Sequence, residues 1–158
     1  MALEEKQAPT ATEEAQATVF SLKQAPVLSA GRYDSVVARS NDLIARVKVY
    51  AEGGENAIHT HLHEDHVFLV LAGQATFHLG RAEREVVVNR FEGVLLPAGA
   101  FYYFQSTGDQ NLVMFRVGTT KKTGGDDRMG PDGLPLPGHS ARNKHVEGVP
   151  VEGKYFGS

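Results

Sequence analysis

This sequence of 158 residues contains no cysteine, no block of basic residues and no long apolar run. The absence of cysteine excludes disulfide bonds, thiolate metal sites and a cysteine nucleophile, and it fits a cytoplasmic protein. The formal net charge is −3 and the cations are dispersed, so no nucleic-acid partner is expected. No run approaches the roughly 18 apolar residues of a membrane helix, so no membrane partner is expected either.

The chain divides into three zones by composition. Residues 1–17 have almost no large apolar side chain and no signal-peptide pattern, so we expect a mobile N-terminal segment. Residues 18–118 carry nearly all the β-branched and aromatic residues, and the length of the chain suits one domain with one core. Residues 119–158 are rich in Gly and Pro, which indicates an extended C-terminal tail rather than a packed helix.

Short apolar runs separated by turn residues fill the middle zone. No stretch there has a convincing helical period, and strands repeating about every 8–12 residues are typical of an all-β sandwich or barrel. The predicted strands are residues 43–50, 66–73, 74–79, 85–88, 93–97, 100–106 and 111–117. A further strand could lie at 18–28. In the tail, Val149, Val151, Tyr155 and Phe156 could hold the chain against the barrel or a partner.

Four of the seven histidines lie in the short segment HTHLHEDH, as His59, His61, His63 and His66. Imidazole is a common protein ligand for Zn, Fe, Ni and Cu. On a strand, His59, His61 and His63 would share one face because side chains alternate, and His66 could complete a facial set. The pattern therefore predicts a metal site, with a surface histidine-rich loop that holds no ion as the alternative.

The segment GGENAIHTHLHEDHVFLVLAG, residues 53–73, resembles the first motif of the cupin superfamily, G-x5-H-x-H-x3–4-E-x6-G. The segment EGVLLPAGAFYYFQS, residues 92–106, matches the second motif, G-x5-P-x-G-x2-H-x3-N, at Pro97 and Gly99. The resemblance spans residues 36–117 and implies a cupin, a single-domain jelly-roll β-barrel. It also implies a homodimer, since cupins often pair through N-terminal strands.

Two positions depart from the family pattern in a way that affects the metal site. His66 stands where the family has its glutamate ligand, and Tyr102 stands where the second motif has its histidine. Position by position, the resemblance therefore implies His59, His61, His66 and Tyr102 as the metal ligands. Asp65 would take the place of His66 only after a one-residue shift of register, which the spacing to the closing glycine of the motif opposes.

These substitutions change the expected chemistry of the site. Three neutral histidines would leave the ion close to its full positive charge, which favours an anionic ligand such as an enolate, a carboxylate or a phenolate. Tyr102 could be that phenolate, could act as a general acid or base beside the ion, or could only fill the barrel.

Four residues are predicted to line a substrate pocket. Phe104 shares a strand face with Tyr102, and Arg46, Tyr50 and Arg116 lie on predicted barrel strands. An inward-facing arginine would bind a carboxylate or phosphate of the substrate, although an outward, solvated side chain is the alternative.

Two other histidines are expected outside the metal site. The motif does not use His63, which we expect in a supporting or loop position. His78 is expected on the outward face of its strand.

These features favour a metalloenzyme that binds one divalent metal ion per chain and acts on a small anionic or oxygen-rich molecule. Iron is the first choice of metal and a non-haem Fe(II) dioxygenase is the leading reaction type, because a 3-His centre resembles those of some cupin dioxygenases. A lyase or isomerase that uses Mn, Zn or Ni is the first alternative. A non-catalytic cupin that binds a metal or a small molecule is the second, since a fold alone does not decide function.

Overall fold

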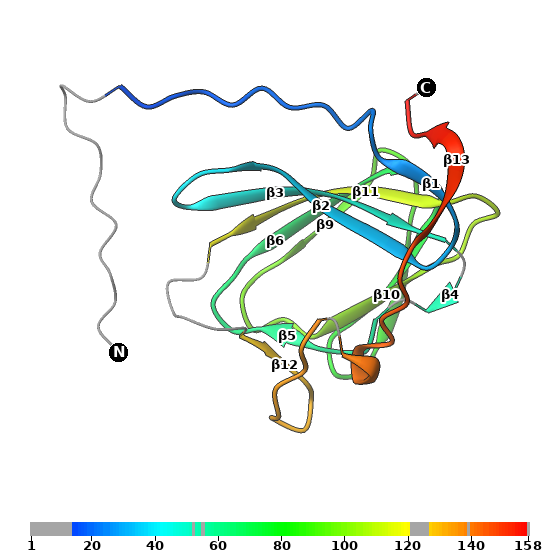
Figure 1. Cartoon of the computed structure of the whole chain (residues 1–158). Helices are drawn as coiled ribbons and strands as arrows, with labels where there is room; N and C mark the ends of the chain where they lie inside the picture. The colour runs from blue at the N-terminus through cyan, green and yellow to red at the C-terminus, as the bar shows by residue number, and fades with distance from the viewer. Residues whose placement is uncertain (1–13, 52, 55, 121–126, 139, 158) are drawn as a thin grey trace.

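The computed structural model describes residues 14–51, 53–54, 56–120, 127–138 and 140–157, which fold into a jelly-roll β-barrel (Figure 1). Most of the segment predicted to be mobile, residues 1–13, lies outside the described residues. The described residues contain strands and one short 3-10 helix, η1 (Ala141–Asn143). No helix in this part of the chain is long and apolar enough to cross a membrane.

Two antiparallel sheets face each other and form the walls of the barrel. The larger sheet contains β2 (Arg32–Arg39), β3 (Leu43–Tyr50), β6 (His66–Ala72), β9 (Gly93–Leu96) and β11 (Leu112–Thr119), in the order β2-β3-β11-β6-β9. The smaller sheet contains β4 (Gly53–Gly54), β7 (Ala75–Leu79), β8 (Arg84–Val88) and β10 (Tyr102–Ser106), in the order β4-β10-β7-β8. Two further antiparallel pairs join β1 (Pro26–Ala30) to β13 (Val149–Tyr155) and β5 (Thr60–His61) to β12 (Arg128–Met129).

The predicted all-β barrel is confirmed, and the seven predicted strands correspond to β3 and β6–β11 with small differences at their ends. β2 was not predicted, because its inward positions carry Arg32 and Asp34 rather than apolar residues. The strand suggested at residues 18–28 begins only at Pro26, and residues 18–25 are not part of a strand.

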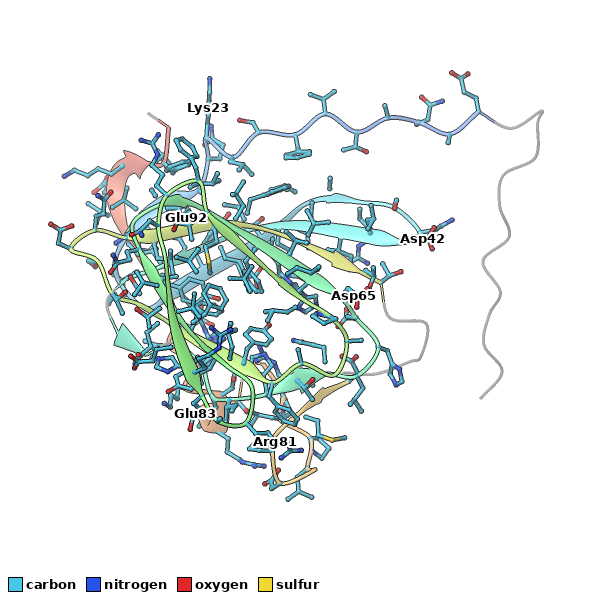
Figure 2. All side chains as sticks on the ribbon, turned by 180° about the vertical axis from the view of Figure 1, so that it is seen from behind. Lys23, Asp42, Asp65, Arg81, Glu83 and Glu92 are labelled. Carbon is cyan, nitrogen blue, oxygen red and sulfur yellow. The ribbon has the colours of Figure 1, made fainter. Side chains whose placement is uncertain are left out.

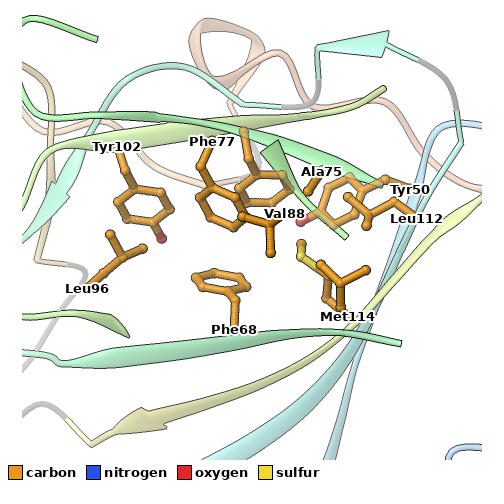
Figure 3. Packing of buried hydrophobic residues seen from close by; sticks show 11 residues of the cluster. Tyr50, Phe68, Ala75, Phe77, Val88, Leu96, Tyr102, Leu112 and Met114 are labelled. Atoms are coloured by element: carbon orange, nitrogen blue, oxygen red, sulfur yellow. The ribbon is translucent and has the colours of Figure 1, made fainter. Parts of the chain in front are cut away.

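Side chains fill the space between the two sheets with a largely aromatic core (Figure 2, Figure 3). Phe68 of β6 packs against Phe77 of β7 and Phe104 of β10, with ring centroids 5.6 Å apart in each pair. Leu112 and Met114 of β11 are fully buried beside these rings. Burial of large aromatic side chains dominates the stability of such a core.

A second apolar cluster covers part of the outer face of the larger sheet. Val49 and Val113 are buried in this cluster, together with Leu28 of β1, and Phe156 packs against it. The backbone N–H of Phe156 donates a hydrogen bond to the carbonyl oxygen of Ala25. The C-terminal tail therefore returns to the barrel of its own chain.

Gly73, the closing glycine of the first motif, directly follows β6 and has a backbone conformation that favours glycine. Its φ is +74°, and a Cβ atom there would lie 2.5 Å from the carbonyl oxygen of Asn111. A larger residue would be strained and would collide with backbone, so the motif glycine fixes the turn that follows β6.

Candidate metal centre and cavity

The histidine segment runs from the residue before β5, which pairs with β12, to the first residue of β6 (Figure 1). His59 is bridged to Tyr102 of β10 by two backbone hydrogen bonds of 3.1 and 2.9 Å. His61 ends the short strand β5 and pairs with Arg128 of β12, and His66 begins β6. The imidazole centroid of His61 lies 5.2 Å from that of His59 and 4.3 Å from that of His66.

Three side chains come close enough to share one metal ion: His61, Glu64 and His66. One ligand atom from each lies within 4.8 Å of the other two. Oε2 of Glu64 is 3.3 Å from Nδ1 of His61 and 3.8 Å from Nε2 of His66. Two imidazoles and one carboxylate form a donor set that fits a divalent transition-metal ion.

The ionisation of Glu64 and His66 suits metal binding. Burial, with the cation of Arg116 adding to it, lowers the pKa of His66 to about 3 despite the opposing Glu64 carboxylate. Burial opposes ionisation of Glu64, but hydrogen bonds with His61 and His66 outweigh it and hold the pKa of Glu64 below its usual range. A neutral imidazole and an ionised carboxylate are the forms that bind metal ions.

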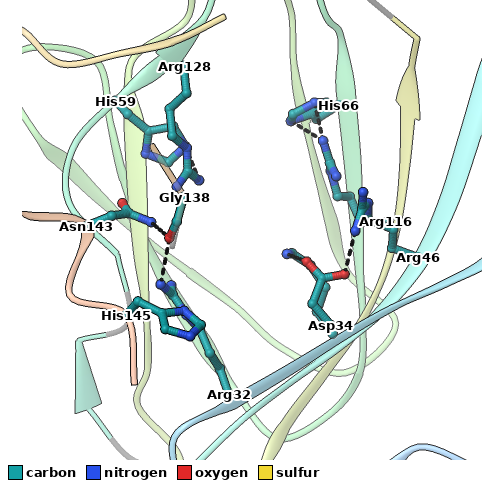
Figure 4. Close-up of polar contacts among 11 residues, drawn as sticks. Arg32, Asp34, Arg46, His59, His66, Arg116, Arg128, Gly138, Asn143 and His145 are labelled. Atoms are coloured by element: carbon teal, nitrogen blue, oxygen red, sulfur yellow. Dashed lines mark hydrogen bonds and ion pairs between the residues drawn. The ribbon is translucent and has the colours of Figure 1, made fainter. Parts of the chain in front are cut away.

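His59 lies beside this cluster but makes a different contact. Its Nδ1 donates a hydrogen bond to the carbonyl oxygen of Ala57 at 2.7 Å, which leaves the lone pair on Nε2. Arg128 donates from Nη2 to that Nε2 at 3.0 Å (Figure 4). Burial and the cation of Arg128 lower the pKa of His59 well below its ordinary value. His59 could therefore bind an ion through Nε2 only if Arg128 moved away.

Arg116 makes a comparable contact with His66 (Figure 4). Its Nη2 lies against Nε2 of His66, and the two residues belong to the neighbouring strands β11 and β6. An ion bound through Nε2 of His66 would displace Arg116 from this position. An arginine thus contacts the Nε2 atom of each of these two histidines.

Tyr102 lies next to the three-residue cluster rather than within it. Its ring centroid is 4.5 Å from that of His59 and 6.4 Å from that of His61, and the residue is 3% exposed. Burial raises the pKa of the Tyr102 hydroxyl, which favours the neutral phenol over the phenolate. In that form Tyr102 can donate a hydrogen bond or a proton to a bound molecule.

A cavity of about 400 Å³ lies between the sheets beside the cluster. The predicted pocket residues all line it, together with two of the predicted ligands: Phe104, Arg46, Tyr50, Arg116, His61 and Tyr102. The tail after β11 closes one side of the cavity, because Arg128, Asn143 and His145 also belong to its wall. Asn143 is 1% exposed, and its Oδ1 accepts a hydrogen bond from the backbone N–H of Ala57.

The wall of the cavity has an excess of positive charge, from Arg32, Arg46, Lys48, Arg116 and Arg128. The carboxylates in the same wall are those of Asp34 and Glu147.

Asp34 accepts hydrogen bonds from two of these cations. Its oxygens lie 3.0 Å from Nη1 of Arg46 and 2.6 Å from Nζ of Lys48. Burial opposes ionisation of Asp34, but Lys48 and Arg46 together hold its pKa below the usual range. Burial lowers the pKa of Lys48 to about 8, against the attraction of Asp34.

The other residues considered from the sequence lie away from the cluster. His63 is exposed, because β5 ends at His61 and the alternation of faces does not continue to it. Asp65 is exposed and its Oδ1 accepts a hydrogen bond from the backbone N–H of Ala98. His78 stacks on Tyr103 with centroids 4.1 Å apart and is only 6% exposed, so its outward strand position is covered.

Several residues of the site were not predicted. Glu64 belongs to a loop, and Arg128 and Asp127 come from the tail, where no periodic pattern marks a functional position. Asp127 lies 3.3 Å from Nδ1 of His61 and accepts a hydrogen bond from the backbone N–H of His63. Lys48 could have been predicted as a cavity residue. It lies two residues from both Arg46 and Tyr50 on a predicted strand, so all three share one face.

The family profile that matches this chain is described as a cupin domain, and the match spans residues 46–118. No curated protein sequence matches the chain significantly.

Solved structures share the fold at low sequence identity. An uncharacterized conserved protein with a double-stranded β-helix domain from Klebsiella pneumoniae has a TM-score of 0.59 and 22% identity, over 75% of this chain and 94% of that one. The Cnp3 cupin domain of Schizosaccharomyces pombe has a TM-score of 0.54 and 16% identity, over 60% and 68% of the two chains. KdgF from Halomonas sp. has a TM-score of 0.52 and 16% identity, over 56% and 80%. At these identities the likeness shows the fold.

Proposed function

The barrel of this chain belongs to the cupin superfamily, and we propose that the protein is a metal-dependent enzyme acting on a small anionic or oxygen-rich molecule. One observation carries the proposal: His61 belongs both to the three-residue cluster and to the wall of the cavity. A molecule in the cavity would therefore lie beside an ion held by His61, Glu64 and His66. Such an ion would supply Lewis acidity toward an oxygen atom of the substrate.

The leading reaction type is a non-haem Fe(II) dioxygenase reaction. Two histidines and one carboxylate with open coordination positions are the donor set of non-haem Fe(II) oxygenases. The carboxylate comes from Glu64 of the loop, although position 66 of the motif carries a histidine. Phe68 and Phe104 give the cavity an apolar side, and the Tyr102 phenol can donate a proton to a bound substrate.

A lyase or isomerase reaction is the second candidate, and Lys48 is the observation that favours it. Its amine lines the cavity, and its pKa of about 8 leaves part of the population as free base near neutral pH. A buried lysine with a lowered pKa is a suitable general base for removing a proton from a substrate. Mn, Zn or Ni at the cluster would suit this chemistry as well as iron.

Oxygen uptake distinguishes these possibilities. Protein reconstituted anaerobically with Fe(II) would be mixed with diketones, catechols and enols, and uptake measured for the wild type and for His61→Ala. The dioxygenase proposal expects uptake with at least one class for the wild type and none for His61→Ala. Metal binding without uptake, but with exchange of a substrate proton for solvent deuterium, would favour the lyase or isomerase. Ligand binding without any turnover would indicate a binding protein.

We also propose a homodimer, with a second copy of the chain covering the outer face of the larger sheet. Val67 and Leu95 lie opposite each other in the register and are 45% and 67% exposed on that face, and burying such neighbouring apolar side chains favours association. Light scattering after gel filtration tests the proposal. The mass of a dimer is expected for the wild type and that of a monomer for Leu95→Glu.

A further inference from the structure

Three cations, Arg46, Lys48 and Arg116, meet on the inner face of the larger sheet. Arg46 and Lys48 occupy alternate inward positions of β3, and Arg116 of β11 lies directly opposite Arg46 in the register. Asp34 of β2 lies opposite Lys48. Like charges directly opposite each other on neighbouring strands are destabilising, so the pair of Arg46 and Arg116 needs a compensating partner.

Asp34 compensates only part of this charge. Both of its oxygens are engaged by Arg46 and Lys48, and no ion pair joins Arg116 to a carboxylate among the residues that the structure describes. Within the same described residues, the buried Nε atoms of Arg46 and Arg116 have no hydrogen-bond partner. Three cations and one carboxylate leave two positive charges and two unpaired donors, which is costly in a partly buried position.

We propose that Arg46, Lys48 and Arg116 form a subsite for a doubly charged anionic group of the substrate, either a phosphate ester or two neighbouring carboxylates. All three side chains line the cavity that also contains His61. The charge of such a group equals the excess that Asp34 leaves, and its oxygens would accept hydrogen bonds from the cationic side chains that line the cavity. Arginine binds phosphate and carboxylate with matching planar geometry. The place of this subsite in catalysis rests on the proposed function.

Two aromatic side chains line the cavity beside the subsite. Tyr50 and Phe104 meet edge to face with centroids 4.9 Å apart, and both line the same cavity as the cations. Arg116 connects the subsite to the metal cluster, since its Nη2 contacts His66 while its Nε has no protein partner. An anion on Arg116 would thus lie close to the cluster.

Calorimetric titration of metal-free protein tests the subsite. The probes are inorganic phosphate and malonate, with formate as a singly charged control. Phosphate or malonate is expected to bind with one ion per chain and about tenfold more tightly than formate. The second negative charge of these two probes adds charge-assisted hydrogen bonds that formate cannot make. Tighter binding of phosphate would indicate a phosphorylated substrate, and tighter binding of malonate a dicarboxylate.

Four variants give this experiment its specificity. Arg46→Gln and Arg116→Gln should each weaken binding of the preferred probe by about tenfold or more, since each removes a charge-assisted contact. Arg39→Gln, at an exposed position of β2, should leave binding unchanged. Arg46→Lys keeps the charge and the fold but loses the guanidinium, so an intermediate affinity is expected.

Absence of binding by both phosphate and malonate would overturn the inference. Wild-type affinity in Arg46→Gln and Arg116→Gln would overturn it equally. Titration with Fe(II) or Zn(II) separates this result from the proposed function. Anion binding without metal uptake would sustain the subsite and refute the metal enzyme, whereas metal uptake without anion binding would refute the subsite alone.

Discussion

Gly118 of β11 lies opposite His66 of β6, and the absence of a side chain at Gly118 leaves the imidazole its space. A Cβ atom at Gly118 would lie 2.9 Å from Cδ2 of His66 and 3.3 Å from Nη2 of Arg116. The position of one member of the proposed metal cluster therefore depends on a glycine in another strand.

Gly118→Ala should displace His66 and weaken metal binding while the barrel stays folded. The expected loss in metal affinity is about tenfold or more, because small displacements of ligands and their supporting groups reduce affinity to this extent. Competition with a chromogenic chelator measures the affinity. Val117→Ala, at the neighbouring outward position, is the matched control. Equal affinity in Gly118→Ala and the wild type would show that His66 does not hold the ion.

Glu64→Gln should weaken metal binding, because the amide keeps the shape of the side chain but removes its negative charge. Asp65→Asn removes a charge of the same sign from the next residue. Asp65 accepts a hydrogen bond from the backbone N–H of Ala98 and is not a member of the cluster, so this variant should bind metal as the wild type does.

Tyr102→Phe should keep its metal and lose activity, because the variant lacks only the phenol hydroxyl beside the cluster. Metal loss in Tyr102→Phe with normal binding in Glu64→Gln would instead restore Tyr102 as a ligand.

Phe77→Ala should lower the free energy of unfolding by about 3–5 kcal/mol, the usual cost of removing a buried aromatic ring. Phe77 is 0% exposed and packs on Phe104 with ring centroids 5.2 Å apart. Val87→Ala, on the neighbouring strand β8 and 52% exposed, should change stability by no more than about 0.5 kcal/mol. Urea denaturation measures both. Similar losses in the two variants would contradict the assignment of the core.

The free energy of unfolding should rise between pH 8 and pH 10 relative to that of Lys48→Met. Burial and the cations of Arg116 and Arg128 lower the pKa of Lys48 from 10.5 to about 8, against the attraction of Asp34. In this range the unfolded chain binds more protons at Lys48 than the folded chain does, so stability increases with pH. The expected gain is about 2–3 kcal/mol.

Urea denaturation of both proteins across this pH range measures the difference. Tyr50 faces the same space, and burial raises its pKa, which removes stability only above pH 10. A constant difference between wild type and Lys48→Met would show that Lys48 has an ordinary pKa.

The fold was predictable because the barrel strands follow simple patterns. Strands such as β6 and β11 are rich in β-branched and aromatic residues, and turn residues separate them. The motif glycine Gly73 also fixes the register through a backbone conformation that other residues rarely adopt. β2 and β13 escaped prediction because they carry polar or exposed residues and gain their place by pairing with β3 and β1.

The site was predictable only where it lies on patterned strands. Arg46, Tyr50 and Arg116 could be placed near a pocket because strand alternation indicates a shared face. Glu64 and Arg128 could not, since a loop and a distant tail bring them to the histidines by tertiary contacts. The contact between Arg128 and His59 is of this kind, joining residues 69 positions apart in the chain.

The metal content of the purified protein tests the central claim most directly. Mass spectrometry would be applied to protein prepared anaerobically without chelators or a His-tag, for the wild type and for His61→Ala/His66→Ala. The account predicts about one divalent ion per chain in the wild type and almost none in the double variant. Equal metal content in the two proteins, or no metal in the wild type after reconstitution, would contradict it.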